Sequence, residues 1–408
     1  MGIGAKRDDM NSSLRGLSRR DFIATSLMAT AGSLTQLEAA ESRSNSRRWR
    51  AAIVGRTGEG NYGHELDVLF NGVPNVDLRA VADPNTKGRA RAALRSNAPR
   101  QYADYREMLR VEKPELVVIA PRWTTRHHEI AMAALECGAH VLTEKPFTTT
   151  LVEADEILAH AKRRDKKVAV AHQMRLAPSI VYLKRSLRDG LLGELQQIHA
   201  WGKQDSRAGG EDMMVLGTHL FDLIRLLAGD AIWCTARVLD KGHEISRGDA
   251  RRVRDEIGPV AGDDVEAQFG FANGVVATFT SRTTLRQTLG PWGMELIGSK
   301  GVIRILTEVM PRVLSRNQKS DEPAGLSDEW QPLSGDPTVG YTAAQRSFVP
   351  ANRRVLDDWL EAIMRDREPQ CSGANAMKAI EMVMAVYEAA LQRARVKLPL
   401  DRRTHPLS

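Results

Sequence analysis

The segment Ala139–Phe147, AHVLTEKPF, begins like a buried strand and ends at a charged pair followed by a proline. Open α/β sheets bind their ligands outside the carboxyl ends of parallel strands, which is where Lys145 would lie. We therefore expect Lys145 to face a bound ligand. The alternative is an ordinary surface lysine after a strand.

A glycine-rich stretch follows the first strand-like run of the chain, Ala51–Val54. This stretch, GRTGEGNYGH, begins with Gly55 and places Gly58, Gly60 and Gly63 at G-x-G-x-x-G spacing. In a dinucleotide site such glycines make a tight turn, let the backbone approach the pyrophosphate, and open a helix whose amides face the phosphates. The spacing alone is a weak signal, but a strand before it and a helix after it strengthen it. The loop is longer than the simplest motif, so which glycines touch phosphate stays open.

An acidic residue, Asp83, follows the strand predicted at Val76–Ala82, about 20 residues past the last glycine of the motif. A carboxylate at this place accepts hydrogen bonds from the ribose 2′-hydroxyl and repels a 2′-phosphate, which favours NAD over NADP as cofactor. Arg56 and Lys87 lie nearby in the sequence and leave NADP open. Asp83 is also the predicted N-cap of a helix that starts at Pro84, and the two roles can coexist.

Short apolar runs alternate with amphipathic segments from Trp49 onward, which predicts a doubly wound parallel sheet of the Rossmann type. The predicted strands are Ala51–Val54, Val76–Ala82, Leu116–Ala120, His140–Thr143 and Val168–Ala171. The predicted helices are Gly63–Phe70, Pro84–Arg95, Tyr105–Val111, Thr125–Glu136 and Leu151–Arg164. Thr150 and Glu153 have the spacing of a capping box at the start of the last helix.

The first forty residues resemble an export signal. The segment Ser18–Ile23, SRRDFI, precedes a weakly apolar stretch, Ala24–Leu37, and two alanines. This order is typical of a twin-arginine signal, and the alternative is an ordinary N-terminal helix with two chance arginines. We predict a signal peptide over residues 1–40, a polar linker over 41–48, recognition by the twin-arginine export machinery, and a periplasmic or secreted mature protein.

The composition is that of a globular protein: the chain has 408 residues, of which 27% are charged, and a formal net charge of +7. The basic residues are spread along the chain without interleaved aromatics, so we expect no nucleic-acid partner. No apolar run is long enough to span a membrane, so we expect no stable membrane insertion after processing. The three cysteines lie far apart and lack metal-ligand spacing, so we expect no metal site, and one disulfide stays open.

Several of these motifs together resemble one family. The glycine-rich turn, Asp83, the segment HHEIAMAALECGAHVLTEKPF and the later GTHLFD are similar to the Gfo/Idh/MocA oxidoreductases, the glucose–fructose oxidoreductase and inositol dehydrogenase family. The likeness spans residues 50–400 and is most specific at Glu144-Lys145-Pro146. The loop TGEGNYGH resembles secreted members. The family implies an NAD(P)-dependent enzyme that forms a homodimer or homotetramer.

The resemblance also implies two domains: a Rossmann domain over residues 49–172 and an α+β domain over 173–400 with a large open, mostly antiparallel sheet, followed by a tail over 401–408. The sequence patterns agree. Strands are predicted at Gln196–Trp201, Ile232–Val238, Val265–Phe271, Val275–Thr280, Met294–Ile297 and Val302–Leu306, and helices at His219–Gly229, Arg354–Arg365 and Ala374–Arg393. Residues 307–345, rich in proline, glycine, serine and charge, are predicted to form a long surface loop.

The family suggests roles for the residues around the E-K-P motif. Its lysine lies beside the nicotinamide and the reacting carbon, which implies that Lys145 holds the substrate hydroxyl and helps its proton leave. Positive charge nearby could lower the pKa of Lys145 and make it usable near neutral pH. Glu144 would be structural or would position the nicotinamide. Pro121, in the loop after the strand at Leu116–Ala120, could contact the dinucleotide.

A second cluster departs from the family pattern. Many relatives carry D-x-G-x-H-x-x-D, in which the first Asp and the His form the acid/base pair, but this chain has Val215 in place of that Asp, followed by His219. Valine cannot transfer a proton. Three explanations stay open: His219 acts with Lys145 alone, the preceding Glu211 or Asp212 enters the site, or ordinary dehydrogenation has been lost.

Other polar residues are expected near the substrate. Gln173 and Arg175 follow the strand at Val168–Ala171, and the resemblance adds Asp222 to these substrate-binding candidates. Helix capping is an equally open role for Arg175. Arg207 could bind an acidic sugar. His127 fits a family position, but we expect it to act at the start of a helix.

These patterns favour an NAD(P)-dependent oxidoreductase that transfers a hydride between a sugar, polyol or sugar derivative and a tightly bound nicotinamide cofactor. NAD is the favoured cofactor, with NADP open. A related alternative is an NAD-dependent glycosidase that oxidises the sugar transiently and cleaves it by elimination. A third alternative is a noncatalytic nucleotide-binding protein, which Val215 favours slightly and the retention of Lys145 and His219 disfavours.

Overall fold

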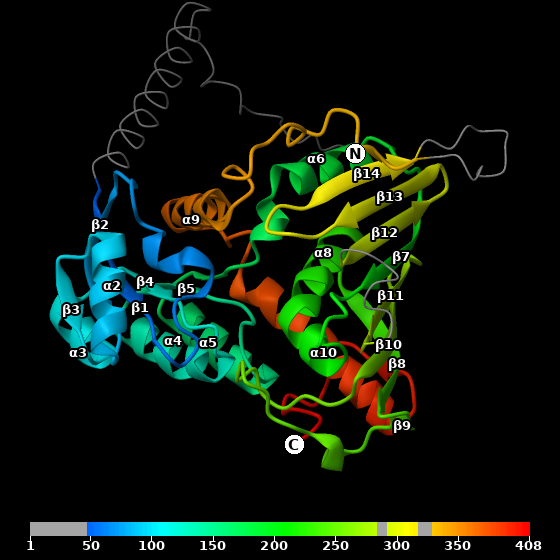
Figure 1. Cartoon of the computed structure of the whole chain (residues 1–408), viewed down its shortest axis with the longest axis horizontal. Coiled ribbons are helices and arrows are strands. Elements are labelled where there is room, and N and C mark those ends of the chain that lie inside the picture. Colours follow the sequence, from blue (N-terminus) through cyan, green and yellow to red (C-terminus); the bar gives the residue numbers. More distant parts are fainter. Residues whose placement is uncertain (1–46, 284–291, 317–328) are drawn as a thin grey trace, which may run out of the picture. The chain divides into compact units, whose positions relative to one another are not determined.

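The computed structural model of the chain describes residues 47–283, 292–316 and 329–408. The predicted signal peptide and most of the predicted linker lie outside this part of the chain. Trp49–Ser408 form one compact unit that contains a parallel sheet and a larger mixed sheet (Figure 1). No helix in the described residues is long and apolar enough to cross a membrane.

Six parallel strands form the first sheet in the order β3-β2-β1-β4-β5-β6, which confirms the predicted Rossmann fold. The strands are β1 (Trp49–Val54), β2 (Val76–Ala82), β3 (Arg100–Tyr102), β4 (Leu116–Ile119), β5 (His140–Thr143) and β6 (Val168–Val170). All residues of β4 and β5 are buried, because helices cover both faces of the sheet. The sequence did not predict β3, since its three residues are polar or aromatic and form no apolar run.

Helices connect these strands. They are α2 (Thr86–Ser96), α3 (Tyr105–Glu112), α4 (His127–Glu136), α5 (Leu151–Arg163) and, after the 3₁₀ turn η3 (Gln173–Leu176), α6 (Pro178–Arg188). The capping box of Thr150 and Glu153 is present. The predicted N-cap role of Asp83 is wrong: Asn85 caps α2 by accepting a hydrogen bond from the Gly88 amide at 2.8 Å. The Asp83 carboxylate instead accepts from the glycine-rich turn, as described below.

The prediction of a regular helix at Gly63–Phe70 is also wrong. It is a short 3₁₀ segment, η1 (Gly63–Val68), in which His64 and Glu65 have left-handed φ values of 46° and 63°. A regular helix with its amides aligned therefore does not follow the glycine-rich turn. The left-handed residues redirect the chain so that the His64 side chain points toward the end of β5, where it meets Glu144.

The second sheet has the order β15-β14-β13-β12-β7-β11-β10-β8-β16, with β9 paired to β8. Its strands are β7 (Leu195–Trp201), β8 (Ala231–Asp240), β9 (His243–Glu244), β10 (Asp264–Phe271), β11 (Val276–Arg282), β12 (Gly293–Gly298), β13 (Gly301–Leu306), β14 (Arg312–Arg316), β15 (Gln331–Pro332) and β16 (Val396–Lys397). Among the described strands of this second sheet only the β7–β11 pair is parallel, which confirms a mostly antiparallel sheet. The predicted loop over 307–345 is wrong in part, because β14 and β15 lie within it.

Helices α8 (Thr218–Ala228) and α10 (Gly373–Gln392) pack together beside this sheet (Figure 1). A short turn, α7 (Gly210–Asp212), and a π-helical turn, η4 (Met213–Gly217), lead into α8. The remaining long helix, α9 (Phe348–Met364), instead completes the core of the Rossmann sheet: its Trp359 is fully buried and packs in one cluster with Ile53 of β1 and Val118 of β4. The first sheet therefore depends on residues far along the chain.

Candidate active site at the edge of the parallel sheet

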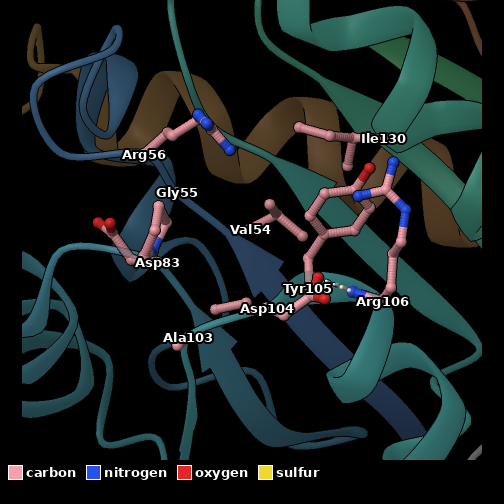
Figure 2. A pocket seen from close by; sticks show the side chains of 11 residues that line it. Val54, Gly55, Arg56, Asp83, Ala103, Asp104, Tyr105, Arg106 and Ile130 are labelled. Carbon is pink, nitrogen blue, oxygen red and sulfur yellow. Dashed lines mark hydrogen bonds between the residues drawn. The ribbon is translucent and has the colours of Figure 1, made fainter.

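A cavity of about 200 Å³ lies at the carboxyl ends of β1 and β2 (Figure 2). Gly55, Arg56, Asp83, Tyr105 and Arg106 are among its lining residues, and we call it the Asp83 cavity. The Asp83 carboxylate is fully buried, and donors from two loops hold it. Thr57 donates through its amide at 3.0 Å and its hydroxyl at 2.7 Å, and Asn85 donates through its amide at 2.9 Å.

The glycine-rich turn packs closely against its neighbours. The Tyr62 ring lies over Gly55, in the space that a Cβ at Gly55 would need. Gly60 has a φ of +86° and its carbonyl accepts from the Arg122 amide at 3.1 Å, so a side chain there would meet the Arg122–Trp123 backbone. Gly63 faces the Glu144 side chain, whereas Gly58 has open space beside it. Three of the four predicted glycines thus permit close contacts within the turn.

The loop after β4 is held by a histidine at the start of α4. His127 is fully buried, and its ring nitrogens bond to the carbonyl oxygens of Pro121 at 2.7 Å and Phe147 at 3.1 Å. The expected helix-start role of His127 agrees with this position. Pro121 lies beside the glycine-rich turn because the next residue, Arg122, bonds to Gly60.

A second cavity, of about 330 Å³, contains the E-K-P lysine, and we call it the Lys145 cavity. Two expected site residues, Gln173 and His219, line it together with Lys145. Lys145 follows β5, and its peptide bond to Pro146 is cis. The structure therefore brings together the lysine, the histidine and the glutamine that the sequence had placed on three separate segments.

The Lys145 side chain is buried, and its Nζ donates to the carbonyl oxygen of Val215 at 3.1 Å. Val215 lies in the π-helical turn η4, and such turns are frequent at functional sites. Burial lowers the pKa of Lys145, and the positive charges of Arg207 and Arg122 lower it further, against the opposing effect of Glu144. Lys145 therefore bonds to a neutral backbone oxygen at Val215, the position where the family resemblance implied a carboxylate.

His219 starts α8 and is buried, with its ring centroid 5.3 Å from that of His172 and 6.2 Å from that of Trp292. Burial holds the pKa of His219 well below its usual range, and Lys145 and His172 add to the effect. Its Nδ1 is buried and has no hydrogen-bond partner among the described residues. His219 is therefore neutral at pH 7, and no side chain described here fixes its tautomer.

Glu144 precedes Lys145 and is fully buried. Its carboxylate accepts hydrogen bonds from His64 Nδ1 and from the Lys145 amide. Burial alone would raise the pKa of Glu144, but the charges of His64 and Lys145 bring it below its ordinary value. Glu144 is thus ionised and joins the glycine-rich turn to the E-K-P motif.

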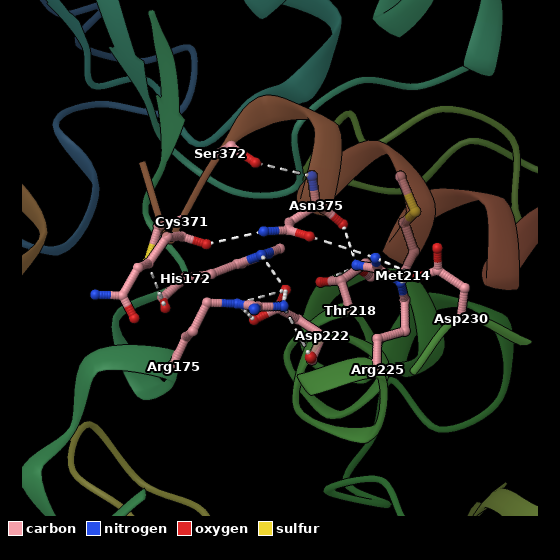
Figure 3. A network of polar contacts seen from close by, with 11 residues as sticks. His172, Arg175, Met214, Thr218, Asp222, Arg225, Asp230, Cys371, Ser372 and Asn375 are labelled. Carbon is pink, nitrogen blue, oxygen red and sulfur yellow. Dashed lines mark hydrogen bonds and ion pairs between the residues drawn. The ribbon is translucent and has the colours of Figure 1, made fainter. Parts of the chain in front are cut away.

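Arg175 and Asp222 bond to each other and are not among the residues that line the Lys145 cavity (Figure 3). Arg175 donates to the Asp222 carboxylate through Nε at 3.0 Å and Nη2 at 2.6 Å. His172 Nδ1 lies 3.7 Å from the same carboxylate, and its ring lies beside that of His219 at an interplanar angle of 57°. Despite burial, Arg175 and His172 hold the pKa of Asp222 far below its usual range. The pair joins η3 to α8, and its contact with a substrate stays a prediction.

The carboxylates proposed to replace the missing Asp do not reach the cavity. Asp212 accepts from the Ser281 hydroxyl at 2.7 Å and the Gln204 amide at 3.2 Å, and neither Asp212 nor Glu211 lines the Lys145 cavity. Burial raises the pKa of Asp212. Arg207, considered for an acidic sugar, is paired with Asp205 at 3.0 Å. Glu211 and Asp212, the two carboxylates weighed from the sequence, therefore do not line the cavity. A different carboxylate, Glu308, does line it and pairs with Arg312 at 3.0 Å.

Sequence reasoning missed several polar and aromatic residues that line the Lys145 cavity, among them His64, Lys203, Trp292 and Glu308. His64 directly follows the last glycine of the motif, and that adjacency was the available signal. Lys203 and Trp292 lie on the second sheet's side of the cavity, and only the folded chain shows that they approach Lys145. Among the described residues no cluster of histidine, cysteine and acidic side chains is arranged to hold a metal ion, and all three cysteines are free.

Fold and site together define an oxidoreductase with an NAD-binding Rossmann domain. Family models agree: residues 49–172 match the "Oxidoreductase family, NAD-binding Rossmann fold" and residues 179–398 its "C-terminal alpha/beta domain". The chain belongs to the Gfo/Idh/MocA oxidoreductase family.

Individual relatives are distant. D-apiose dehydrogenase of Paraburkholderia graminis is 24% identical over 86% of this chain and 90% of its own length. Levoglucosan dehydrogenase of Pseudarthrobacter phenanthrenivorans is 26% identical over 58% of this chain and 67% of its own length. A solved levoglucosan dehydrogenase in complex with NADH and levoglucosan has a TM-score of 0.67 at 21% identity, covering 87% of this chain and 100% of the other. An aldose-aldose oxidoreductase from Caulobacter crescentus has a TM-score of 0.65 at 19% identity, covering 86% and 100%.

The residues at the two cavities fit NAD. Asp83 offers a fixed carboxylate at the end of β2, where a ribose hydroxyl is bound in such folds, and its three donors leave acceptor capacity. The Asp83 cavity and the Lys145 cavity provide separate spaces for the two halves of a dinucleotide at one sheet edge. Glu144 and Pro121 follow β5 and β4 at the same sheet edge.

Proposed function

We propose that this protein oxidises a secondary alcohol of a sugar, polyol or sugar derivative, with NAD as the hydride acceptor. The observation that carries the proposal is Lys145: a buried lysine with a lowered pKa, in a cavity at the carboxyl edge of a Rossmann sheet. Its relatives include dehydrogenases of apiose and levoglucosan, which supports a carbohydrate-like substrate.

NAD, when bound, supplies the electron acceptor. In our proposal Asp83 holds its adenosine ribose, the turn containing Gly55, Gly58, Gly60 and Gly63 and the adjacent Pro121 border its diphosphate, and Glu144 and Lys145 border its nicotinamide half. The buried carboxylate of Asp83 disfavours the 2′-phosphate of NADP by charge repulsion.

Lys145 has the central chemical role. Burial lowers the pKa of Lys145 and so favours its neutral amine, and this amine accepts the proton of the substrate hydroxyl as the C–H electron pair leaves. The Val215 carbonyl holds Nζ in place but cannot take up the proton. Neutral His219 hydrogen-bonds a substrate hydroxyl, and Gln173 contacts another.

Location and assembly are part of the proposal. The twin-arginine motif at Ser18–Ile23 supports export to the periplasm, and this export route carries folded proteins, which suits an enzyme that must acquire its nucleotide in the cytoplasm. A tightly held NAD would then cycle between two substrates. The large second sheet supports a homodimer or homotetramer.

The test begins with nucleotide identification. The exported protein is purified, a portion is denatured, and the released nucleotide is identified by mass spectrometry. The remainder is mixed with D-apiose, levoglucosan, D-glucose and myo-inositol and followed at the absorbance of reduced nicotinamide. We expect released NAD and a lasting rise with at least one sugar.

Controls separate the alternatives. The rise should be lost in Lys145→Ala and kept in Lys184→Ala, which removes an exposed lysine of α6. Bound NAD without a lasting rise, accompanied by sugar release from glycosides, would replace the proposal with the glycosidase. A protein that neither contains nor takes up NAD would refute it.

A further inference from the structure

Two histidines line the Lys145 cavity, and their hydrogen bonding differs. His64 Nδ1 bonds to the buried carboxylate of Glu144, whereas His219 Nδ1 is buried without a partner among the described residues. A carboxylate bonded to one ring nitrogen fixes the histidine tautomer, leaves the other nitrogen as a proton acceptor, and stabilises the imidazolium that forms. His64 has this arrangement and His219 does not.

The two histidines also differ in their access to water. The side chain of His64 is 24% exposed, while the whole residue is 6% exposed for both Lys145 and His219. A proton that reaches Lys145 must leave before the next turnover, and Lys145 is too deeply buried to release it directly. His64 combines a bond to the buried carboxylate of Glu144 with contact to solvent.

Contacts from helix α9 hold His64 in place. Asn352 of α9 donates through Nδ2 to the His64 carbonyl oxygen at 2.7 Å, and Asn352 Oδ1 accepts from Gln173 Nε2 at 2.7 Å. The Phe348 ring lies against the imidazole, with centroids 4.6 Å apart. Together these contacts stabilise the left-handed backbone of His64, a conformation that costs energy for a residue other than glycine.

We propose that His64, oriented by Glu144, relays the substrate proton from Lys145 to solvent and thereby supplies the function of the carboxylate that Val215 replaces. This inference rests on the proposed dehydrogenase function. The substrate O–H bond breaks and its proton passes to Lys145 Nζ. The C–H electron pair leaves as hydride to NAD⁺, and the carbonyl double bond forms. Lys145 then gives the proton to His64 Nε2, directly or through one water, and His64 gives it to bulk water, while Glu144 stays ionised.

The first test is chemical rescue with imidazole. His64→Gly removes the ring, and glycine adopts the left-handed backbone without strain, so the turn should keep its shape. With whichever sugar of the panel the wild-type enzyme oxidises, we expect kcat to fall about 100-fold, the scale of general acid–base catalysis. Added imidazole should restore kcat in a saturable manner, and NAD affinity measured by calorimetry should change less than about threefold.

Two variants serve as controls. His64→Gln can still bond to Glu144 but cannot carry a proton, so it should be as slow as His64→Gly. His160→Gln removes a histidine of α5 that bonds to Glu136 at 3.0 Å and lines neither cavity, so its kcat should be unchanged. A His64→Gly enzyme with wild-type kcat, or one whose loss imidazole does not restore, would overturn the relay while leaving dehydrogenation intact.

A second measurement does not depend on activity. Long-range ¹⁵N–¹H spectra of the histidine side chains at pH 8, with His64 assigned by its loss in His64→Gln, should show a proton on Nδ1 and none on Nε2. An Nε2-protonated His64 would overturn the proposal whatever the kinetics. If the wild-type enzyme oxidises no sugar at all, the proposed function fails and the relay fails with it.

Discussion

The Asp83 cavity and the Lys145 cavity lie at the carboxyl edge of the same parallel sheet, but they surround their charged groups differently. The Asp83 carboxylate accepts three short hydrogen bonds from a loop and a helix start. Lys145 donates to one neutral carbonyl oxygen, and burial lowers its pKa. A carboxylate held by several donors is suited to recognition, because its position is fixed and it keeps acceptor capacity for a ligand. A poorly compensated charge is suited to proton transfer, because its two protonation states lie close in energy.

Removing the reactive amine should have the largest effect. Lys145→Met keeps much of the side-chain volume but cannot accept a proton, and we expect kcat to fall at least about 1000-fold, a loss of roughly 4 kcal/mol in transition-state stabilisation. Stopped-flow measurement of NADH formation tests this, with calorimetric NAD binding as the control. A loss of rate explained entirely by lost NAD binding would contradict the contrast between the cavities.

Disrupting the ion pair beside the Lys145 cavity should be next in size. Asp222→Asn leaves the Arg175 guanidinium buried without its countercharge, and we expect a loss of about 3 kcal/mol in the free energy of unfolding, measured by urea denaturation. The matched control is Asp357→Asn, which breaks an exposed pair with Arg353 on α9 and should cost less than about 0.5 kcal/mol. Equal losses in the two variants would argue against a supporting role for the buried pair.

The pH dependence of the rate follows from the lowered pKa of Lys145. The neutral amine is the active form, so kcat/KM should rise about tenfold per pH unit at low pH and level off at a pH below 10.5, the ordinary pKa of lysine. His219, already neutral at these pH values, should add no limb. In Lys145→Arg this limb should disappear from the residual activity, because a guanidinium does not lose its proton. A limb centred at the ordinary lysine value would contradict desolvation of the amine.

The smallest effect is expected in the Asp83 cavity. Asp83→Ala removes the ribose acceptor and the partner of Thr57, so NAD should bind about tenfold more weakly, roughly 1.4 kcal/mol, while kcat at saturating NAD stays within about twofold. Titration calorimetry with NAD and NADP measures this, and NADP should lose less affinity than NAD. Asp77→Ala on the same strand, where the carboxylate pairs at the surface with Arg79, is the control. A large fall in kcat would mean that Asp83 does more than recognise the cofactor.

Sequence reasoning predicted the parts of this site that short-range patterns encode. The apolar run at His140–Thr143 predicts a strand that is buried on both faces of the sheet. Lys145 follows this strand and must therefore lie at the sheet edge where the strand ends. The second sheet was largely predictable because its strands are bounded by turn residues such as Asn273-Gly274. β14 was missed because only one of its residues is fully buried and polar sequence surrounds it.

Long-range contacts were beyond such patterns. The left-handed backbone of His64 depends on Asn352, nearly three hundred residues later in the chain, and no local signal links the two. Asp83 had the local signature of an N-cap next to Pro84, but its carboxylate instead accepts hydrogen bonds from the amide and hydroxyl of Thr57. Val215 could be recognised from the sequence as a departure from the family pattern. The hydrogen bond from Lys145 to the Val215 carbonyl oxygen could not be predicted, because that oxygen lies in a π-helical turn which the sequence did not indicate.

Helix α9 has a consequence for how the protein is made. Its Val355, Leu356 and Trp359, with Cys371 after it, complete the core beneath β1 and β4, and its Asn352 holds the turn beside Lys145. A ribosome must therefore synthesise almost the whole chain before the nucleotide-binding half can close its core. During synthesis one apolar face of the parallel sheet therefore stays uncovered until α9 emerges, about three hundred residues after the first strand. Truncation before α9 should yield a chain that chaperones retain, and not a smaller nucleotide-binding protein.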